Sequence, residues 1–186
     1  MRFAFRLTDE DLDYDVLTAI TAYLDCEHYA WLHARNYAHY EILEDTPTTS
    51  RIIQHSKYFG FVFKQHHFRE YIPPSEFRML SDKPFPIYTH TTFTPTSDGG
   101  SHRSVDVTID LPLVLWPFRK LLAAHLRRYD RRVYDEDATA AKRRARFFGK
   151  NNWSWAFRPS QFLLHKDAVV EAFSDQIHAS KHRTQV

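Results

Sequence analysis

The stretch DLPLVLWPFRKLLAAHLRRYDRRVYDEDATAAKRRARFFG, residues 110–149, decides the fold that the sequence predicts. Both of its prolines lie near the start, where a helix tolerates them, and Gly149 provides a stop signal at the end. Between these signals, core-type side chains recur at steps of four, three and four, at Leu122, Leu126, Tyr129 and Val133. Because this spacing places them on one face, we predict one long helix with that face turned toward the core.

The sequence before this helix predicts an antiparallel sheet. From about residue 38 to residue 110 the hydrophobic pattern has period two, and β-branched and aromatic residues are frequent. Short turn signals separate six predicted strands, near residues 38–45, 50–58, 60–70, 76–82, 87–95 and 103–110. Consecutive short strands with short turns are typical of an antiparallel meander.

The two ends of the chain contribute further elements. Residues 1–7, MRFAFRL, alternate and predict a strand. The acidic residues and N-cap candidates of 8–16 predict the start of an amphipathic helix that ends near 35–36. Residues 166–182 predict a short last helix.

Together these elements predict an α+β domain. A curved antiparallel sheet is expected to wrap around the long C-terminal helix and to enclose a cavity against it. This order of elements resembles the START-like (SRPBCC), helix-grip fold. We expect residues 1–186 to form a single domain of this kind, with a core of about 1–150 and a C-terminal extension of 151–186.

Composition excludes several classes of function. Four glycines without a phosphate-binding motif, and a net charge of +2, indicate neither a nucleotide loop nor a nucleic-acid binder. The longest apolar run, residues 111–118, is too short for a transmembrane segment, and the acidic start lacks a signal-peptide core, so we expect a cytoplasmic protein. A single cysteine, Cys26, allows neither an internal disulfide nor a thiolate cluster. The 12 histidines instead suggest a search for a metal site.

Ionisable residues interrupt two apolar patterns. LDCEHYAWLH, residues 24–33, places Asp25, His28 and His33 in apolar and aromatic surroundings. In the long helix, the step of four after Val133 reaches Asp137, whereas Asp135 and Glu136 are expected to point away from the stripe. A buried carboxylate requires a cation or strong hydrogen bonds, and the two candidate cations are Arg144 and a metal ion.

Two imidazoles and one carboxylate are a typical ligand set for non-haem Fe(II). His28 and His33 are five residues apart, which places them about 140° apart on an ideal helix. They can therefore face one metal ion only if the helix breaks or bulges between them, or ends near His33.

On a predicted strand, the neighbouring pair His66 and His67 can send only one ring inward.

The segment Asp25-Cys-Glu-His28-Tyr-Ala-Trp-Leu-His33 fits the pattern D-x-x-H-x-x-x-x-H and resembles the catalytic domain of Rieske-type non-haem iron oxygenases. Glu136-Asp137-Ala-Thr-Ala-Ala resembles the late acidic segment of that family, and the matched region is roughly 10–150. The resemblance implies a helix-grip fold, Fe(II) held by His28, His33 and Asp137, and Asp25 as a link to a ligand histidine or an electron donor. One cysteine cannot build a Rieske cluster, so the electrons would come from a separate protein.

Three hypotheses follow. The first is a non-haem Fe(II)-dependent oxygenase that acts on a hydrophobic cyclic or aromatic small molecule. The second is a metal-free START-like carrier of a hydrophobic ligand, with Asp137 paired to Arg144. The third is a helix-grip cyclase or hydrolase, with His28 or Asp137 as general acid or base. The sequence allows a homo-oligomer without defining one.

Overall fold

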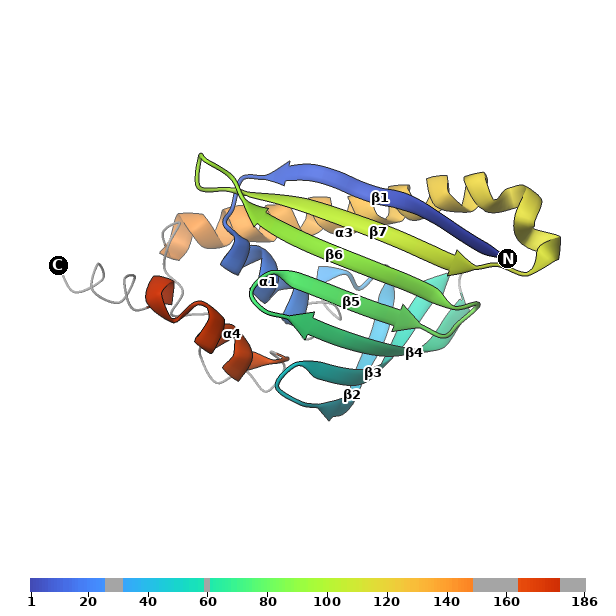
Figure 1. Cartoon of the computed structure of the whole chain (residues 1–186), viewed down its shortest axis with the longest axis horizontal. Coiled ribbons are helices and arrows are strands. Elements are labelled where there is room, and N and C mark those ends of the chain that lie inside the picture. The colour runs from blue at the N-terminus through green and yellow to red at the C-terminus, as the bar shows by residue number, and fades with distance from the viewer. Residues whose placement is uncertain (26–31, 59–60, 149–163, 178–186) are drawn as a thin grey trace.

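An antiparallel sheet is the central layer of the molecule (Figure 1). The structure, a computed structural model, describes residues 1–25, 32–58, 61–148 and 164–177. Within these ranges the strands are β1 (Arg2–Leu12), β2 (Tyr37–Asp45), β3 (Thr49–Tyr58), β4 (Phe61–Ile72), β5 (Glu76–Ser81), β6 (Ile87–Pro95) and β7 (Ser101–Asp110). Their order in the sheet is β1-β7-β6-β5-β4-β3-β2, with antiparallel pairing throughout. The predicted meander is confirmed, and β1 extends it beside β7.

The long helix lies on one face of this sheet. In Figure 1, α3 (Arg119–Phe148) runs behind β1 and β7, and the short 3-10 helix η1 (Leu113–Phe118) leads into it. Two shorter helices, α1 (Val16–Leu24) and α4 (Lys166–Ala172), gather at one end of the sheet. The α+β helix-grip fold predicted from the sequence is therefore confirmed, although its late helical segment begins as a 3-10 turn at Leu113.

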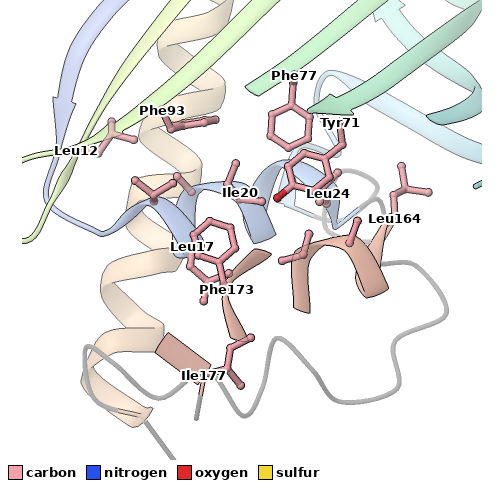
Figure 2. Close-up of a cluster of buried hydrophobic side chains, with 14 residues drawn as sticks. Leu12, Leu17, Ile20, Leu24, Tyr71, Phe77, Phe93, Leu164, Phe173 and Ile177 are labelled. Carbon is pink, nitrogen blue, oxygen red and sulfur yellow. The ribbon is translucent and has the colours of Figure 1, made fainter. Parts of the chain in front are cut away.

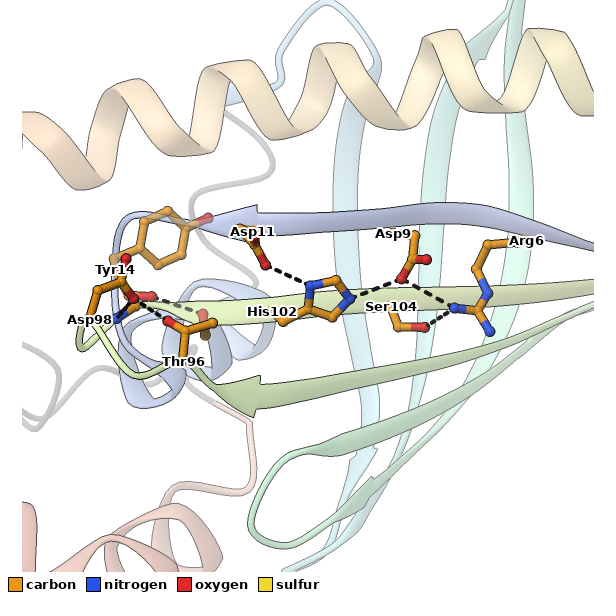
Figure 3. A network of polar contacts seen from close by, with 10 residues as sticks. Arg6, Asp9, Asp11, Tyr14, Thr96, Asp98, His102 and Ser104 are labelled. Atoms are coloured by element: carbon orange, nitrogen blue, oxygen red, sulfur yellow. Dashed lines mark hydrogen bonds and ion pairs between the residues drawn. The ribbon is translucent and has the colours of Figure 1, made fainter.

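The acidic residues between 8 and 12 belong to β1 and not to a helix. Residues 8–12 were expected to open a helix, but they continue β1 and pair with β7 beyond a bulge between Arg6 and Thr8. Figure 3 shows the reason: Asp9 and Asp11 flank His102 on β7, at 2.9 and 2.7 Å from its two ring nitrogens. The N-cap of α1 is instead Asp15, whose side chain accepts a hydrogen bond from the backbone N–H of Thr18 at 2.9 Å.

The first helix is also shorter than predicted. It ends at Leu24 rather than near residues 35–36, because Asp25 takes an extended conformation with φ −76° and ψ 94°. The carbonyl of Leu24 accepts a hydrogen bond from the N–H of Leu164 at 3.1 Å, so the C-terminal segment adjoins this helix end. The prediction of one helix that runs through to residues 35–36 is therefore wrong.

Two hydrophobic clusters hold the layers together. Figure 2 shows the first, in which α1 side chains such as Leu17 and Ile20 pack against Phe77 and Phe93 of the sheet and against Leu164. The second joins β7 to the first half of α3 through Val105, Val107, Ile109 and Leu111, with Leu122 and Leu126 packed against them. Burial of these side chains fixes α3 and α1 against the sheet and leaves a space between the two clusters.

Candidate functional site

A cavity of about 210 Å³ opens between the sheet and α3. The helix side of its wall carries four residues of the predicted stripe: Leu126, Tyr129, Val133 and Asp137. All seven strands, β1 to β7, contribute to the sheet side, and α1 closes part of the wall with Tyr23 and Leu24. The predicted cavity of the helix-grip fold is present, and Asp137 lines it as the helical spacing requires.

Most of the wall is apolar. It includes Phe77 of β5, Ile87 of β6, and Val105 and Val107 of β7. A cavity of about 150 Å³ with an aliphatic and aromatic lining is large enough to hold a benzene ring. The cavity here is therefore of the right size and character for a substituted ring or two fused rings.

His33 is fully buried where the chain enters β2. Its carbonyl accepts hydrogen bonds from the N–H groups of Asn36 at 2.8 Å and Tyr37 at 3.0 Å, which fixes the residue at the start of the strand. The side chain has 0% exposure and reaches α3 with both ring nitrogens. Nε2 lies 3.0 Å from Oδ1 of Asp137, and Nδ1 lies 2.5 Å from Oε2 of Glu136.

This geometry corrects one prediction about the acidic segment. Asp135 is exposed, as its helical position predicts, but Glu136 turns to His33 instead of pointing away. The reason is that the His33 ring, which precedes β2, lies between two neighbouring positions of α3, so a long Glu side chain can reach it from the flank of the stripe. Helical periodicity describes where a Cβ points and not where a flexible carboxylate ends.

Two carboxylates around one imidazole change its protonation. Burial lowers the pKa of His33, but the hydrogen bonds and negative charges of Asp137 and Glu136 outweigh burial, so the pKa is raised above its usual value. Without another ligand, the charged imidazolium is therefore the favoured partner of the two acids.

The same atoms also fit a metal site. Two ligands at right angles, each about 2.1 Å from an octahedral ion, lie about 3.0 Å apart, which matches the Nε2–Oδ1 separation. In such a site Nδ1 of His33 would donate to Glu136, and a carboxylate on the outer nitrogen of a ligand histidine is a common arrangement. The donor set of one imidazole nitrogen and one carboxylate oxygen suits Fe(II).

The remaining predicted site residues are only partly placed. His28 lies outside the described residues, as do Cys26 and the side chain of Arg144. Asp25 is half-buried and caps the end of α1. Within the described part of the chain, no group of three or more His, Cys, Asp or Glu residues could hold a metal ion. The structure thus brings together His33 and Asp137 of the predicted triad.

A buried arginine with two acidic partners was not predicted from the sequence. Arg103 of β7 is 6% exposed and donates to Asp130 of α3 at 2.5 Å and to Glu10 of β1 at 3.3 Å. Its guanidinium also lies 5.8 Å from the centre of the Tyr23 ring, and both Arg103 and Asp130 line the cavity. The alternation of side chains along β7 could have revealed it, because Arg103 lies two and four residues before Val105 and Val107 and so faces the same side of the sheet.

The histidine pair on β4 divides as the strand pattern predicts. His66 is exposed, whereas His67 is 5% exposed and lines the cavity. Its Nδ1 lies 3.1 Å from the sulfur of Met79, and its Nε2 has no hydrogen-bond partner among the described residues. Burial, assisted by Arg69 and His66, lowers the pKa of His67 to about 3, so the ring is neutral.

Comparison with known proteins bears on the fold. Neither a protein-family model nor a curated protein matches the sequence. Among solved structures, the chain is similar to the Zhui aromatase/cyclase from Streptomyces sp. R1128, with a TM-score of 0.64, 13% identity, and coverage of 78% of this chain and 96% of that one. It is also similar to dicamba monooxygenase bound to 3,6-dichlorosalicylic acid, with a TM-score of 0.62 and 12% identity over 100% of this chain and 61% of that one. Ara h 8.0201 gives a TM-score of 0.59 and 14% identity, covering 75% of this chain and 97% of that one.

These likenesses show the helix-grip fold. Their identities are low, and their names describe proteins of different activity, so the activity of this chain has to be inferred from the residues of its own site.

None of the described helices is long and apolar enough to cross a membrane.

Proposed function

We propose that this chain is the catalytic domain of a mononuclear non-haem iron oxygenase that acts on a hydrophobic cyclic or aromatic small molecule. The observation that carries the proposal is the contact of His33 Nε2 with Asp137 Oδ1 at 3.0 Å, on a carboxylate that lines an apolar cavity. A metal ion there would face a ligand in the cavity. The likeness to dicamba monooxygenase supports the proposal, because it covers the whole chain, C-terminal extension included.

In this proposal His28, His33 and Asp137 would hold Fe(II), which would supply the activation of O2. Glu136 accepts a hydrogen bond from Nδ1–H of His33, and with the proton on Nδ1 the Nε2 lone pair remains available for the metal. Asp25, at the end of α1, orients a ligand histidine or relays an electron from a separate electron-transfer protein. The apolar wall around Phe77 and Val107 holds the ring of the substrate and excludes water.

A second candidate is a metal-free helix-grip protein that binds a hydrophobic ligand. The observation in its favour is that Asp137 and Glu136 satisfy both ring nitrogens of a protonated His33 without any ion. Ara h 8.0201 and the Zhui aromatase/cyclase have the same fold, so Asp137 could also serve as a general acid or base in a cyclase or hydrolase.

Metal content separates these candidates. The protein is reconstituted with Fe(II) under anaerobic conditions, desalted, and analysed for iron by mass spectrometry. We expect about one iron per chain for the wild type, a large loss in His33→Ala and Asp137→Ala, and wild-type content in Asp135→Ala, because Asp135 is exposed on the other face of α3. Wild-type protein that retains no iron would refute the oxygenase proposal and favour the metal-free candidate.

A further inference from the structure

The connection between β7 and α3 exposes a group of large apolar side chains. Leu113, Val114, Phe118 and, one turn into α3, Leu121 are 73%, 76%, 58% and 69% exposed, and no residue of η1 is buried. We call these four side chains the η1 patch. In Figure 1 this connection forms the end of the molecule next to the N-terminus, away from α4. A group of exposed apolar side chains on a folded protein commonly marks a surface that contacts a protein or a membrane.

The backbone beneath the η1 patch is held firmly. Leu111, directly before η1, is 1% exposed, and Trp116 packs against the second hydrophobic cluster with its ring edge toward Phe3, 6.2 Å between ring centres. Arg119 lies over the Trp116 ring at 4.7 Å and donates to its carbonyl at 3.0 Å. Because these contacts fix η1 against the sheet, the side chains of the η1 patch are held outward by the fold.

The charge around the η1 patch is strongly positive. Between residues 111 and 134 the sequence contains one acid, Asp130, and this acid pairs with the buried Arg103 at 2.5 Å. Asp110, which precedes η1, pairs with Arg2 at 3.0 Å. Exposed basic residues are frequent in the same stretch: Lys120, Arg127, Arg128, Arg131 and Arg132.

Three of these cations are available to a partner. Arg127 donates to the backbone carbonyl of Arg6 at 2.9 and 3.2 Å, and Arg131 interacts electrostatically with Glu10. The others make no ion pair within the part of the chain that the structure describes: Lys120, Arg128 and Arg132.

The apolar and basic side chains share one face of α3. Arg128 and Arg132 follow Leu121 by seven and eleven residues, which places all three within about 20° of each other around the helix. Leu126, which packs against the sheet, lies about 140° away from Leu121. The exposed Asp135 marks the end of this basic row. The outer face of α3 therefore continues from the η1 patch into a row of cations.

The partner has to match both parts of this surface. A nucleic acid would pair with the cations but would leave the apolar side chains in water. A bilayer with anionic lipid offers negative headgroups and, a few ångströms deeper, hydrocarbon. We propose that η1 and the outer face of α3 dock this protein on the surface of a bilayer that contains anionic lipid. This inference does not depend on the proposed function, because none of its residues contacts His33 or Asp137.

Vesicle sedimentation tests the proposal. The affinity of the protein is measured for vesicles of phosphatidylcholine alone and for an equimolar mixture with phosphatidylserine. We expect binding to the mixed vesicles and at least tenfold weaker binding to phosphatidylcholine alone. Leu113→Ser should weaken binding to the mixed vesicles by about tenfold, because it removes an inserted apolar side chain, and Arg128→Gln by about fivefold, the contribution of one cation near the surface.

Two matched controls lie on other strands. Leu43→Ser removes an apolar side chain that is 57% exposed on β2, and Arg51→Gln removes a cation that is 67% exposed on β3. Both should bind the mixed vesicles as the wild type does. Because Leu113 is exposed, Leu113→Ser should keep the wild-type melting temperature, so that its weaker binding reports on docking and not on folding.

Several results would overturn the proposal. They are wild-type protein that does not sediment with the mixed vesicles, equal affinity for the two kinds of vesicle, and unchanged binding in Leu113→Ser. Light scattering after size-exclusion chromatography tests the remaining occupant, a second copy of this chain. A wild-type dimer that becomes a monomer in Leu113→Ser would assign the η1 patch to that copy and refute docking on a bilayer.

Discussion

Acidification should destabilise this protein in part through one buried histidine, and His67→Phe should remove that part. In the unfolded chain His67 has the ordinary pKa of 6.5, whereas burial lowers its pKa to about 3 in the folded state. Below pH 6.5 the unfolded state therefore binds a proton that the folded state does not bind. Stability falls as the pH falls from about 6.5 toward 3, and it is unaffected by this group above about pH 7.

The size of the effect follows from the two pKa values. A pH of 5 is about 1.5 units below the pKa of His67 in the unfolded chain, and each unit corresponds to about 1.4 kcal/mol. His67 should thus lower the free energy of unfolding by about 2 kcal/mol between pH 7 and pH 5. His67→Phe keeps a ring of similar shape and cannot bind the proton. The free energy of unfolding of this variant should therefore fall by about 2 kcal/mol less than that of the wild type between pH 7 and pH 5.

Urea denaturation at pH 7 and pH 5 measures this difference directly. The other histidines contribute equally to the wild type and to His67→Phe, and they cancel when the two acid-induced losses are subtracted. His66→Phe is the matched control, and it should keep the full contribution of His67. Equal losses in the wild type and His67→Phe would show that His67 takes up a proton in the folded state, and would refute the neutral buried ring.

Three further changes test other parts of the structure. Glu136→Gln should weaken Fe(II) binding by about 10- to 100-fold, since it removes the negative charge that faces Nδ1 of His33. Asp135→Asn should leave Fe(II) binding unchanged, and a metal titration measures the affinity of both variants. Asp130→Ala should lower the free energy of unfolding by about 3 kcal/mol in urea, because it removes the nearer of the two acidic partners of the buried Arg103 guanidinium, and a loss below 1 kcal/mol would contradict this. Gly100→Ala should cost about 1–3 kcal/mol in the same assay, because a Cβ there collides with the carbonyl oxygen of Leu12; wild-type stability would show that the turn can relax.

The fold was predictable because its elements carry strong periodic signals. The stripe of Leu126, Tyr129 and Val133 is long enough to identify α3, and it places Asp137 at the cavity by counting alone. The boundary between β1 and α1 was not predictable in the same way. Acidic residues such as Asp9 and Asp11 are typical of helix starts, and only their pairing with His102 across the sheet shows that they belong to a strand.

The candidate site was predictable only in part, since it depends on contacts distant in sequence. The pattern around His33 and the position of Asp137 were visible in the chain, and the structure brings these two residues together. The approach of Glu136 could not be read from a helical wheel, because it depends on where β2 places His33. Arg103 was missed because its partners, Asp130 and Glu10, come from two other elements.

The most direct test of the oxygenase proposal is a crystal structure of the Fe(II)-reconstituted protein with anomalous diffraction data on both sides of the iron absorption edge. The contact between His33 Nε2 and Asp137 Oδ1, 3.0 Å long, fits two ligands of one ion as well as a hydrogen bond, and the anomalous map distinguishes these. We predict an iron peak about 2.1 Å from both atoms, on the cavity side of α3. Density for a direct hydrogen bond between the two side chains, with no iron peak beside them in the reconstituted protein, would contradict the proposal.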